Sequence, residues 1–313
     1  MNLNINKSNI DKHYYRVYGL NIESEIEIPE FMTIKNEETK EFTDSLVKMS
    51  YGIMEADIKG FINKGQMIGF TKDTLWFHIK DVATYYVANG DTVICEPCEN
   101  PDKQLLNVFL MCSCLGFIMI QRDKVAIHGG TIVIDDKAII ITGDRGAGKS
   151  TLTTALRLKG YPFIADDVAG TVLEDVPMIN PGFPYQKLCE DAMDRMGYDK
   201  ETCVSFTGDG KTKYMVPAHE EFIEHDVNLH GIFELTVEDV ESVQIEEIKG
   251  NEKLSKIIAN IYRTEFLTRM GGMKPKYMKQ CIDIARNIKF YKITRPNGKF
   301  TTDEQIEIIK SVI

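Results

Sequence analysis

The chain has 313 residues, of which 43% are apolar and 27% charged. A chain of this length forms one large domain or two ordinary ones, and its composition excludes a disordered tether. Lys and Arg number 37 against 47 Asp and Glu, which gives a net charge of -10. Because this charge repels phosphate backbones and anionic lipid, we expect neither nucleic acid nor a membrane as a partner.

Seven cysteines are an odd number in a chain too large to need disulfides for its stability. Residues 1–11 carry no apolar signal core, so we expect free thiols and a cytoplasmic location. Cys95 and Cys98 form a C-x-x-C pair with no second pair at zinc-ligand spacing, which favours core or loop positions. The most apolar stretch, Leu105 to Ile120, is shorter than the roughly 20 residues that cross a bilayer, and a buried helix is expected.

Short runs rich in β-formers dominate the first hundred residues, and Asn89-Gly90 marks a turn between two of them. The pattern predicts an antiparallel, β-rich N-terminal module over residues 1–99. Asn100, as N-cap, and Pro101 mark the expected start of the apolar helix and of a second domain over residues 100–313. The expected strands are Tyr14–Leu20, Gln66–Thr71, Thr74–Lys80, Ala83–Val87 and Thr92–Cys95.

The second half of the chain predicts a mixed α/β domain. Thr131–Ile134 and Ala138–Thr142 are joined by so few residues that they must form an antiparallel hairpin. A glycine-rich loop follows the second arm of this hairpin. The later pattern predicts helices over Lys149–Lys159, Lys187–Met196, Glu252–Arg269 and Lys276–Asn287, strands over Tyr161–Ala165, Leu229–Leu235, Val243–Ile248 and Phe290–Ile293, and a closing helix from Thr302.

The glycine-rich loop matches the phosphate-binding pattern G-x-x-x-x-G-K-[ST] and lies between a predicted strand and a predicted helix. Its glycines allow backbone N–H groups to face an anion, and the following helix directs its positive end to the same place. The pattern therefore predicts that ATP or another nucleoside triphosphate binds here with Mg²⁺; the alternative is a glycine-rich turn with an exposed lysine. The predicted nucleotide-binding residues are Gly143, Asp144, Arg145, Gly146, Ala147, Gly148, Lys149, Ser150 and Thr151.

Two adjacent aspartates, Asp166 and Asp167, follow Lys149 by 17 and 18 residues. A three-turn helix and a short strand span this interval, so the pair is expected to return beside the phosphate loop. Neighbouring side chains at a strand end point in different directions. One carboxylate can then face a metal ion while the other accepts a proton from an alcohol. Without the loop, an Asp-Asp turn or a helix cap would be the better interpretation.

His128 precedes Gly129-Gly130 at the end of a strand that should run beside the strand leading to the loop. An imidazole there could bind a phosphate oxygen or orient an aspartate. A histidine in a strand is as often a satisfied core residue, so both interpretations stay open.

From His128 to Ala169 the sequence resembles the catalytic half of HPr kinase/phosphorylase, whose fold is similar to that of phosphoenolpyruvate carboxykinase. The resemblance implies that Lys149 binds phosphate, that Ser150 and Asp166 bind Mg²⁺, that Asp167 is the general base, and that His128 assists. Relatives form hexamers, so the resemblance leaves a homo-oligomer open, but no seam in this sequence indicates one. The family's second signature, which supplies another metal ligand, has no recognisable counterpart after Asp167, and we therefore expect kinase activity without phosphorolysis.

The N-terminal stretch from Tyr15 to Glu30 instead resembles stand-alone kinases of this family that act on ribosomally made peptides, including lasso-peptide precursor kinases. This resemblance implies phosphoryl transfer from ATP to a serine or threonine hydroxyl of a precursor peptide. A small-molecule hydroxyl kinase acting on free serine or a sugar is the first alternative. A nucleotide-binding sensor without catalysis is the second, and it would have no need of a carboxylate at position 167.

Overall fold

The computed structural model describes residues 11–35, 39, 46–208 and 211–313. The chain divides into two compact units, Met1–Gln121 and Arg122–Ile313. The apolar helix therefore belongs to the first unit, whereas the sequence pattern assigned it to a domain that begins at residue 100. The expectation about a signal segment concerns residues that lie almost wholly outside the described part.

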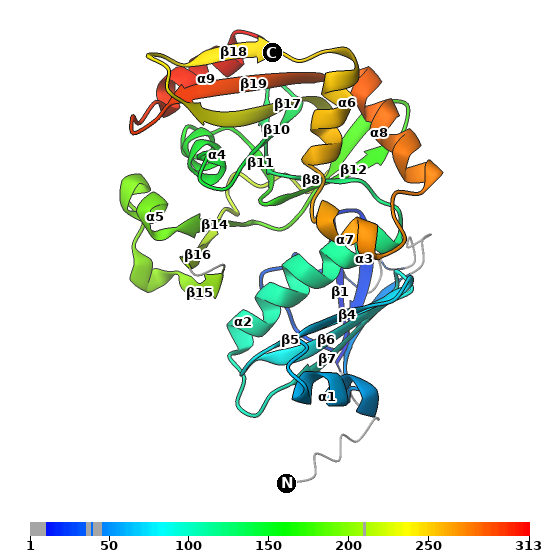
Figure 1. Ribbon diagram of the computed structural model, residues 1–313. Coiled ribbons are helices and arrows are strands. Elements are labelled where there is room, and N and C mark those ends of the chain that lie inside the picture. Colours follow the sequence, from blue (N-terminus) through cyan, green and yellow to red (C-terminus); the bar gives the residue numbers. More distant parts are fainter. Residues whose placement is uncertain (1–10, 36–38, 40–45, 209–210) are drawn as a thin grey trace. The chain divides into compact units, whose positions relative to one another are not determined.

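The first unit contains a seven-stranded sheet in the order β1-β2-β3-β7-β6-β5-β4 (Figure 1). The expectation of a purely antiparallel module is wrong, because β3 runs parallel to both β2 and β7. The run from residue 14 to 20 also bends, since Tyr18 and Gly19 adopt positive φ and close the β1–β2 hairpin. The strands are β1 (His13–Val17), β2 (Leu20–Ser24), β3 (Val47–Tyr51), β4 (Ile68–Phe70), β5 (Thr74–Ile79), β6 (Ala83–Ala88) and β7 (Thr92–Pro97).

A long helical run covers one face of this sheet, formed by α2 (Lys103–Val108), the π-helical turns η2 (Phe109–Cys114) and α3 (Leu115–Gln121), while α1 is Ala56–Asn63. The Tyr85 hydroxyl of β6 donates to the carbonyl oxygen of Leu106 (3.1 Å). Asp102, rather than Asn100, caps α2 by accepting two backbone N–H groups. Lys103–Gln121 is long and apolar enough to span a membrane, but 72% of its most apolar window is buried. The run is therefore the core helix that the sequence predicts.

The second unit is built on a mixed nine-stranded sheet, which makes the chain a mixed α/β protein. β9 and β10 form the predicted hairpin, and β10, β17 and β19 run parallel at its centre. The strands are β8 (Ala126–His128), β9 (Gly130–Ile134), β10 (Lys137–Gly143), β11 (Phe163–Ala165), β12 (Val168–Leu173), β13 (Pro177–Asn180), β17 (Val227–Glu238), β18 (Gln244–Glu247) and β19 (Lys289–Pro296).

Helices cover both faces of this sheet. Side chains of β10 and β17 alternate between the faces, so Ile141 and Leu235 enter the core beneath α4 and α9, whereas Thr142 and Glu234 face α6. The helices are α4 (Lys149–Leu158), α5 (Glu190–Met196), the 3₁₀ turn η3 (Lys200–Thr202), α6 (Gly250–Ala259), α7 (Thr264–Arg269), α8 (Pro275–Asn287) and α9 (Thr302–Lys310).

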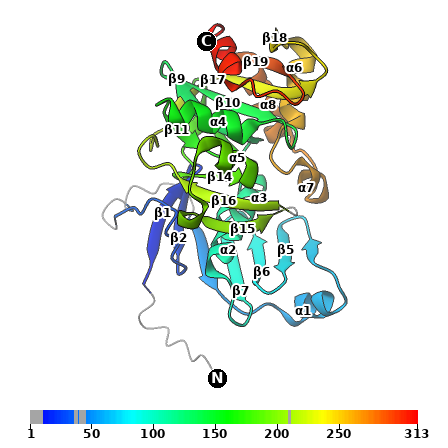
Figure 2. The same cartoon turned by 90° about the vertical axis from the view of Figure 1, so that its left-hand side faces the viewer.

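A separate antiparallel sheet of three strands lies beside α4 and α5 (Figure 2). It contains β14 (Tyr185–Cys189), β15 (Val204–Gly208) and β16 (Lys211–Pro217). The buried Gln186 of β14 accepts hydrogen bonds from Arg157 Nε (2.8 Å) and from Thr154 Oγ1 (3.3 Å) of α4. Because side chains alternate along a strand, this contact turns the neighbouring Lys187 to the opposite face.

Two helix predictions need correction. Lys187–Met196 was expected to be one helix, but it begins as β14 and becomes helical only at Glu190, because the start of the segment pairs with β16. Glu252–Arg269 was expected to be continuous, but it is broken at residues 260–263. Arg263 has a positive φ of 55°, and the backbone N–H of Tyr262 donates to Ala126 in β8. A tertiary hydrogen bond replaces a helical one there.

Candidate active site

The phosphate loop leaves β10 at Gly143 and enters α4 at Lys149, as the pattern predicts. Gly143, Gly146 and Gly148 all have positive φ, and a Cβ at Gly143 would lie 2.3 Å from the carbonyl oxygen of Leu235. Glycine is therefore required where the loop begins. Lys149 Nζ donates to the carbonyl oxygens of Gly143 (2.7 Å) and Asp144 (3.1 Å), so the ammonium group lies over the loop.

Arg295 of β19 donates hydrogen bonds to this loop. Its Nε donates to the carbonyl oxygen of Ala147 (2.8 Å), and a terminal nitrogen lies 3.4 Å from that of Gly146. A loop that turns its N–H groups toward an anion must turn its carbonyl groups away. Arg295 contacts two of the loop carbonyls and so connects the loop to β19.

The two aspartates lie at the turn between β11 and β12. Asp167 has a φ of 63°, and the N–H of Val168 donates to the carbonyl oxygen of Asp166 at 2.6 Å. This is a γ-turn centred on a non-glycine residue with positive φ, a strained conformation that proteins keep chiefly where function requires it. The turn also separates the carboxylates: the Asp166 residue is only 6% exposed, whereas the Asp167 side chain is 29% exposed.

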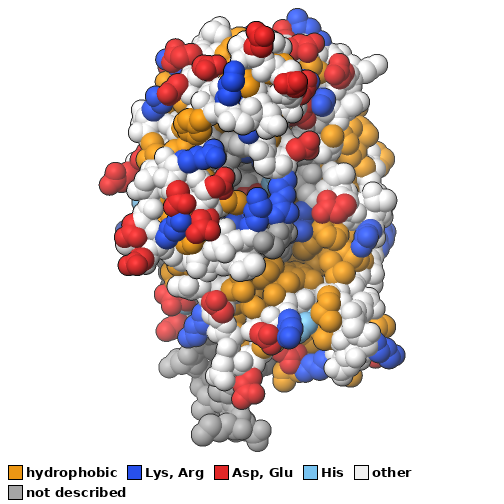
Figure 3. Space-filling view, turned by 60° about the vertical axis from the view of Figure 1, so that its left-hand side comes forward, with side chains coloured by type: hydrophobic (Ala, Val, Ile, Leu, Met, Phe, Trp, Pro, Cys, Tyr) orange, Lys and Arg blue, Asp and Glu red, His pale blue; other side chains and the backbone are white. Residues whose placement is uncertain are grey.

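Lys187 contacts both aspartates. Its Nζ lies 2.5 Å from Asp167 Oδ2, and its backbone N–H donates to Asp166 Oδ2 at 2.9 Å. The lysine side chain is only 9% exposed, so the ion pair is shielded from solvent. Lys213 of the neighbouring strand β16 adds a second positive charge that acts on the pair. Figure 3 also shows a group of basic side chains gathered on the surface.

These surroundings change the acidity of the two aspartates in opposite directions. Burial raises the pKa of Asp166 to about 6, although the charge of Lys187 opposes this. Burial would also raise the pKa of Asp167, but Lys187, His128 and Lys213 together lower it below its ordinary value. Asp167 is therefore ionised at neutral pH, while the charge of Asp166 is poorly compensated.

His128 lies at the end of β8 and faces Asp167. Its Nδ1 is 3.0 Å from the Asp167 carbonyl oxygen and 3.5 Å from Oδ1 of the same residue. Burial lowers the pKa of His128, so the ring is neutral at pH 7. Because a carbonyl oxygen can only accept, Nδ1 carries the proton and Nε2 keeps its lone pair.

A hydrogen-bond network holds the backbone of His128 in place. Its N–H donates to the Asn260 carbonyl oxygen (2.8 Å), and its own carbonyl oxygen accepts from the Thr142 hydroxyl (2.6 Å). The Asn260 amide in turn donates to Glu234 (2.9 Å), which forms an ion pair with Lys256 (2.7 Å). The strand that leads to the phosphate loop is thus connected to the strand that carries His128.

The structure brings the predicted catalytic residues together. Burial lowers the pKa of Lys149, and the charges of Asp167, Asp144 and Asp166 oppose this effect, so both aspartates of the pair act on this lysine. Ser150 and Thr151 occupy the first turn of α4. Arg145 is exposed on the loop. Lys149, Asp166, Asp167 and His128 therefore belong to one site, although their chemical roles stay predictions.

The described residues contain no group of three His, Cys, Asp or Glu side chains arranged to hold a metal ion. Mg²⁺ with a nucleotide needs only one or two protein ligands, because phosphates and water complete its shell. Asp166 fits this requirement, since a cation would compensate its buried charge. Ser150, in the first turn of α4, is the hydroxyl that the loop pattern assigns to the metal. Glu190, an acidic residue that follows Asp167 in the chain, is exposed and forms an ion pair with Lys200 (3.1 Å), so it is directed away from this role.

The sequence pattern did not reveal several residues of this site. Lys187 and Lys213 belong to strands that carry no motif, and only the pairing of β14 with β16 brings them to the aspartates. Arg295 belongs to no motif either, and it binds loop carbonyls. Arg263 has its guanidinium over the Tyr262 ring, and the charges of Tyr262 and Asp167 contribute to raising its pKa.

No family model and no curated protein matches this sequence. Among solved structures, the chain is similar to the Hpr(Ser) kinase/phosphatase from Coxiella burnetii, with 14% sequence identity and a TM-score of 0.31. The match covers 59% of this chain and 88% of that chain. A similarity this weak assigns neither a family nor an activity, and the function has to be argued from the residues of the site.

Proposed function

We propose that this chain is an ATP- and Mg²⁺-dependent kinase that transfers the γ-phosphoryl group to a serine or threonine hydroxyl of a peptide. One observation carries the proposal: the phosphate-loop lysine and an ionised carboxylate on a strained turn share one site. A protein that only binds nucleotide with Mg²⁺ could use Asp166 as a metal ligand, but it has no need of the second carboxylate, Asp167, beside its phosphate loop.

In the proposed reaction the loop N–H groups and Lys149 hold the phosphates, and Asp167 lies where an alcohol can approach. The alcohol oxygen forms a bond to the γ-phosphorus while the bond from that phosphorus to the bridging oxygen of ADP breaks. The hydroxyl proton passes to Asp167. When bound, Mg²⁺ would neutralise charge on the phosphates, and Ser150 and Asp166 are the residues that would hold it.

A carboxylate with a lowered pKa is a weak base, yet this suits phosphoryl transfer. The transition state is loose, and the alcohol loses its proton late, so positioning matters more than basicity. Lys187 keeps Asp167 ionised and fixes its orientation, and the neutral His128 contacts the same residue from another side. Lys187 also supplies positive charge near the transferred group.

The proposal that the acceptor is a peptide, and specifically a lasso-type precursor, rests on the N-terminal resemblance alone. Free serine or a sugar is the alternative acceptor, and it would use the same base and the same phosphate loop. A nucleotide sensor without catalysis is the alternative from another functional class, and the presence of Asp167 beside the phosphate loop argues against it.

The test is transfer of label from γ-labelled ATP with Mg²⁺ to serine-containing peptides, precursor peptides and free serine. Asp167→Asn removes the base and should lower the transfer rate by about 100-fold, with nucleotide affinity within a few-fold of wild type. Asp175→Asn is the matched control, because Asp175 is exposed in the turn between β12 and β13, and it should leave the rate unchanged. Undiminished transfer by Asp167→Asn would remove the proposed base, and ATP binding without transfer to any hydroxyl would favour the sensor.

A further inference from the structure

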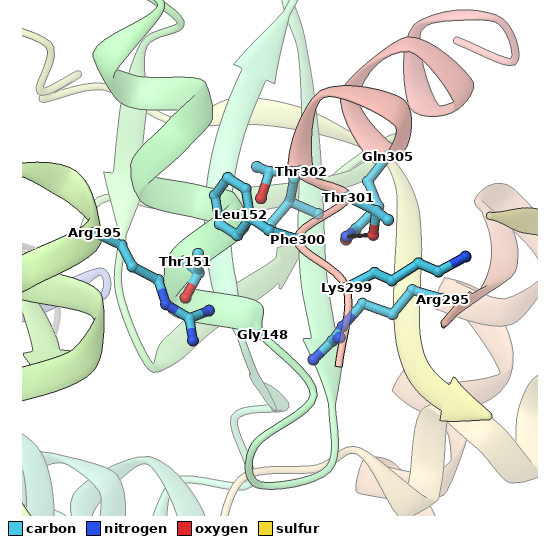
Figure 4. A pocket seen from close by; sticks show the side chains of 10 residues that line it. All are labelled: Gly148, Thr151, Leu152, Arg195, Arg295, Lys299, Phe300, Thr301, Thr302 and Gln305. Carbon is cyan, nitrogen blue, oxygen red and sulfur yellow. Dashed lines mark hydrogen bonds between the residues drawn. The ribbon is translucent and has the colours of Figure 1, made fainter. Parts of the chain in front are cut away.

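A pocket lies beside the phosphate loop, on the flank of Gly148 and Thr151 (Figure 4). It is formed where the start of α4, the end of α5 and the segment between β19 and α9 meet. The lining residues are Gly148, Thr151, Leu152, Arg195, Arg295, Lys299, Phe300, Thr301, Thr302 and Gln305. The proposed phosphoryl transfer uses the other flank of the loop, where Lys149 and the aspartates lie.

The position of the pocket follows the direction in which a bound nucleotide must run. In a loop of this pattern the backbone N–H groups hold the α- and β-phosphates, and the lysine reaches the β- and γ-phosphates. The γ-phosphate therefore lies toward Lys149, and the α-phosphate with its nucleoside lies away from it. Thr151 and Gly148 belong both to the loop and to the pocket, so the pocket is where the nucleoside would extend.

The side chains of the pocket suit a nucleoside. The Phe300 ring is 59% exposed, which is unusual for a large aromatic side chain, and the Arg195 guanidinium lies 5.9 Å from its centre. Figure 4 shows Arg195 and Arg295 directed from different elements toward the space in front of Gly148. Burial lowers the pKa of Arg295, and the like charge of Arg195 lowers it further. Arg195, Arg295 and Lys299 all line this pocket, and their positive charge favours an anion in it.

We infer that this pocket binds the nucleoside end of the nucleotide, with the base stacked on Phe300 and Arg195 beside the α-phosphate. This inference rests on the proposed function. None of the ten described lining residues is acidic, so no carboxylate is present to accept from the N1 and N2 donors of guanine. Stacking accepts any base, and the pocket should therefore discriminate weakly between ATP and GTP.

The experiment is calorimetric titration of the full chain with ATP, GTP and inorganic triphosphate, which lacks a nucleoside. Phe300→Ala should weaken ATP binding by about tenfold, the usual effect of losing one stacked base, and should change triphosphate binding by less than about twofold. Phe300→Tyr keeps the aromatic face and should restore ATP affinity. Phe61→Ala, at a similarly exposed phenylalanine of the first unit, is the control and should have no effect.

The inference is overturned if Phe300→Ala leaves the affinity for ATP unchanged. It is also overturned if the affinities for ATP and triphosphate fall equally, because equal losses indicate a damaged loop. A wild-type preference for ATP over GTP of more than about 100-fold would contradict stacking as the source of affinity. Failure of the proposed function looks different. If the wild-type chain binds neither ATP nor triphosphate, both proposals are overturned together. The same holds if Lys149→Ala leaves the affinities for ATP and triphosphate at their wild-type values.

Discussion

The phosphate loop and the β14–β16 pair contribute to the same site in different ways. The loop is a continuous segment whose glycines, lysine and hydroxyl residue function in the order in which they occur. The lysines of β14 and β16 are 26 residues apart in sequence and meet at the aspartates only because the two strands pair. The geometry of the loop is therefore local to one segment, whereas the strand pair supplies charge through tertiary packing. Substitutions in the two regions should therefore have different effects.

Lys187→Met should have the largest effect in the strand pair. It removes the ion pair of Asp167, and the transfer rate should fall by about 100-fold, a typical effect of losing a buried electrostatic contact in an active site. The pKa of Asp167 would also rise, because its main positive partner is gone. The base would then be protonated at higher pH, and the acid limb of the rate profile should move to higher pH.

Lys187→Arg retains the positive charge and serves as the matched control. It should keep the acid limb near that of wild type and recover part of the rate. If Lys187→Met leaves both the melting temperature and the acid limb of the rate profile unchanged, Lys187 does not set the charge of Asp167.

Asp166→Asn should stabilise the protein at neutral pH in the presence of EDTA. Burial raises the folded-state pKa of Asp166 to about 6 from an ordinary value of 3.8, so the ionised carboxylate is unfavourable above pH 6. Asn removes this charge and can still accept the Lys187 N–H. The free energy of unfolding should rise by about 1–3 kcal/mol at pH 7.5.

This gain should disappear near pH 4, where Asp166 is protonated in the folded state and becomes protonated in the unfolded state as well. Urea unfolding at both pH values measures it, and Asp175→Asn provides the exposed comparison. A variant less stable than wild type at pH 7.5 would mean that Lys187 compensates the charge of Asp166 fully.

Arg295→Gln should have the smallest of these effects, and it tests the loop. The substitution removes hydrogen bonds to the carbonyl oxygens of Ala147 and Gly146, so the loop loses part of its preorganisation. Affinity for ATP and for inorganic triphosphate should fall by about tenfold each. Arg286→Gln, at an exposed arginine at the end of α8, should leave both unchanged. A loss confined to ATP would assign Arg295 to the nucleoside rather than to the loop.

Local patterns predicted much of the fold. The β9–β10 hairpin followed from its short turn, and α4 followed from the glycine-lysine pattern and the apolar spacing after it. Predictions failed where long-range pairing overrode local preference. β14 was interpreted as the start of a helix because its pairing with β16 is invisible in a local window. The break before α7 also comes from a contact with β8, which is distant in sequence.

The sequence by itself determined the phosphate loop, the adjacent aspartates and the histidine, because each depends on residue type and on short spacing along the chain. Only the tertiary structure decided how these groups are charged and held. The ion pair of Asp167 with Lys187 and the hydrogen bonds from Arg295 to the loop carbonyls join segments that are distant in sequence. The acidity of a buried group depends on what surrounds it in space, and folding alone creates those surroundings.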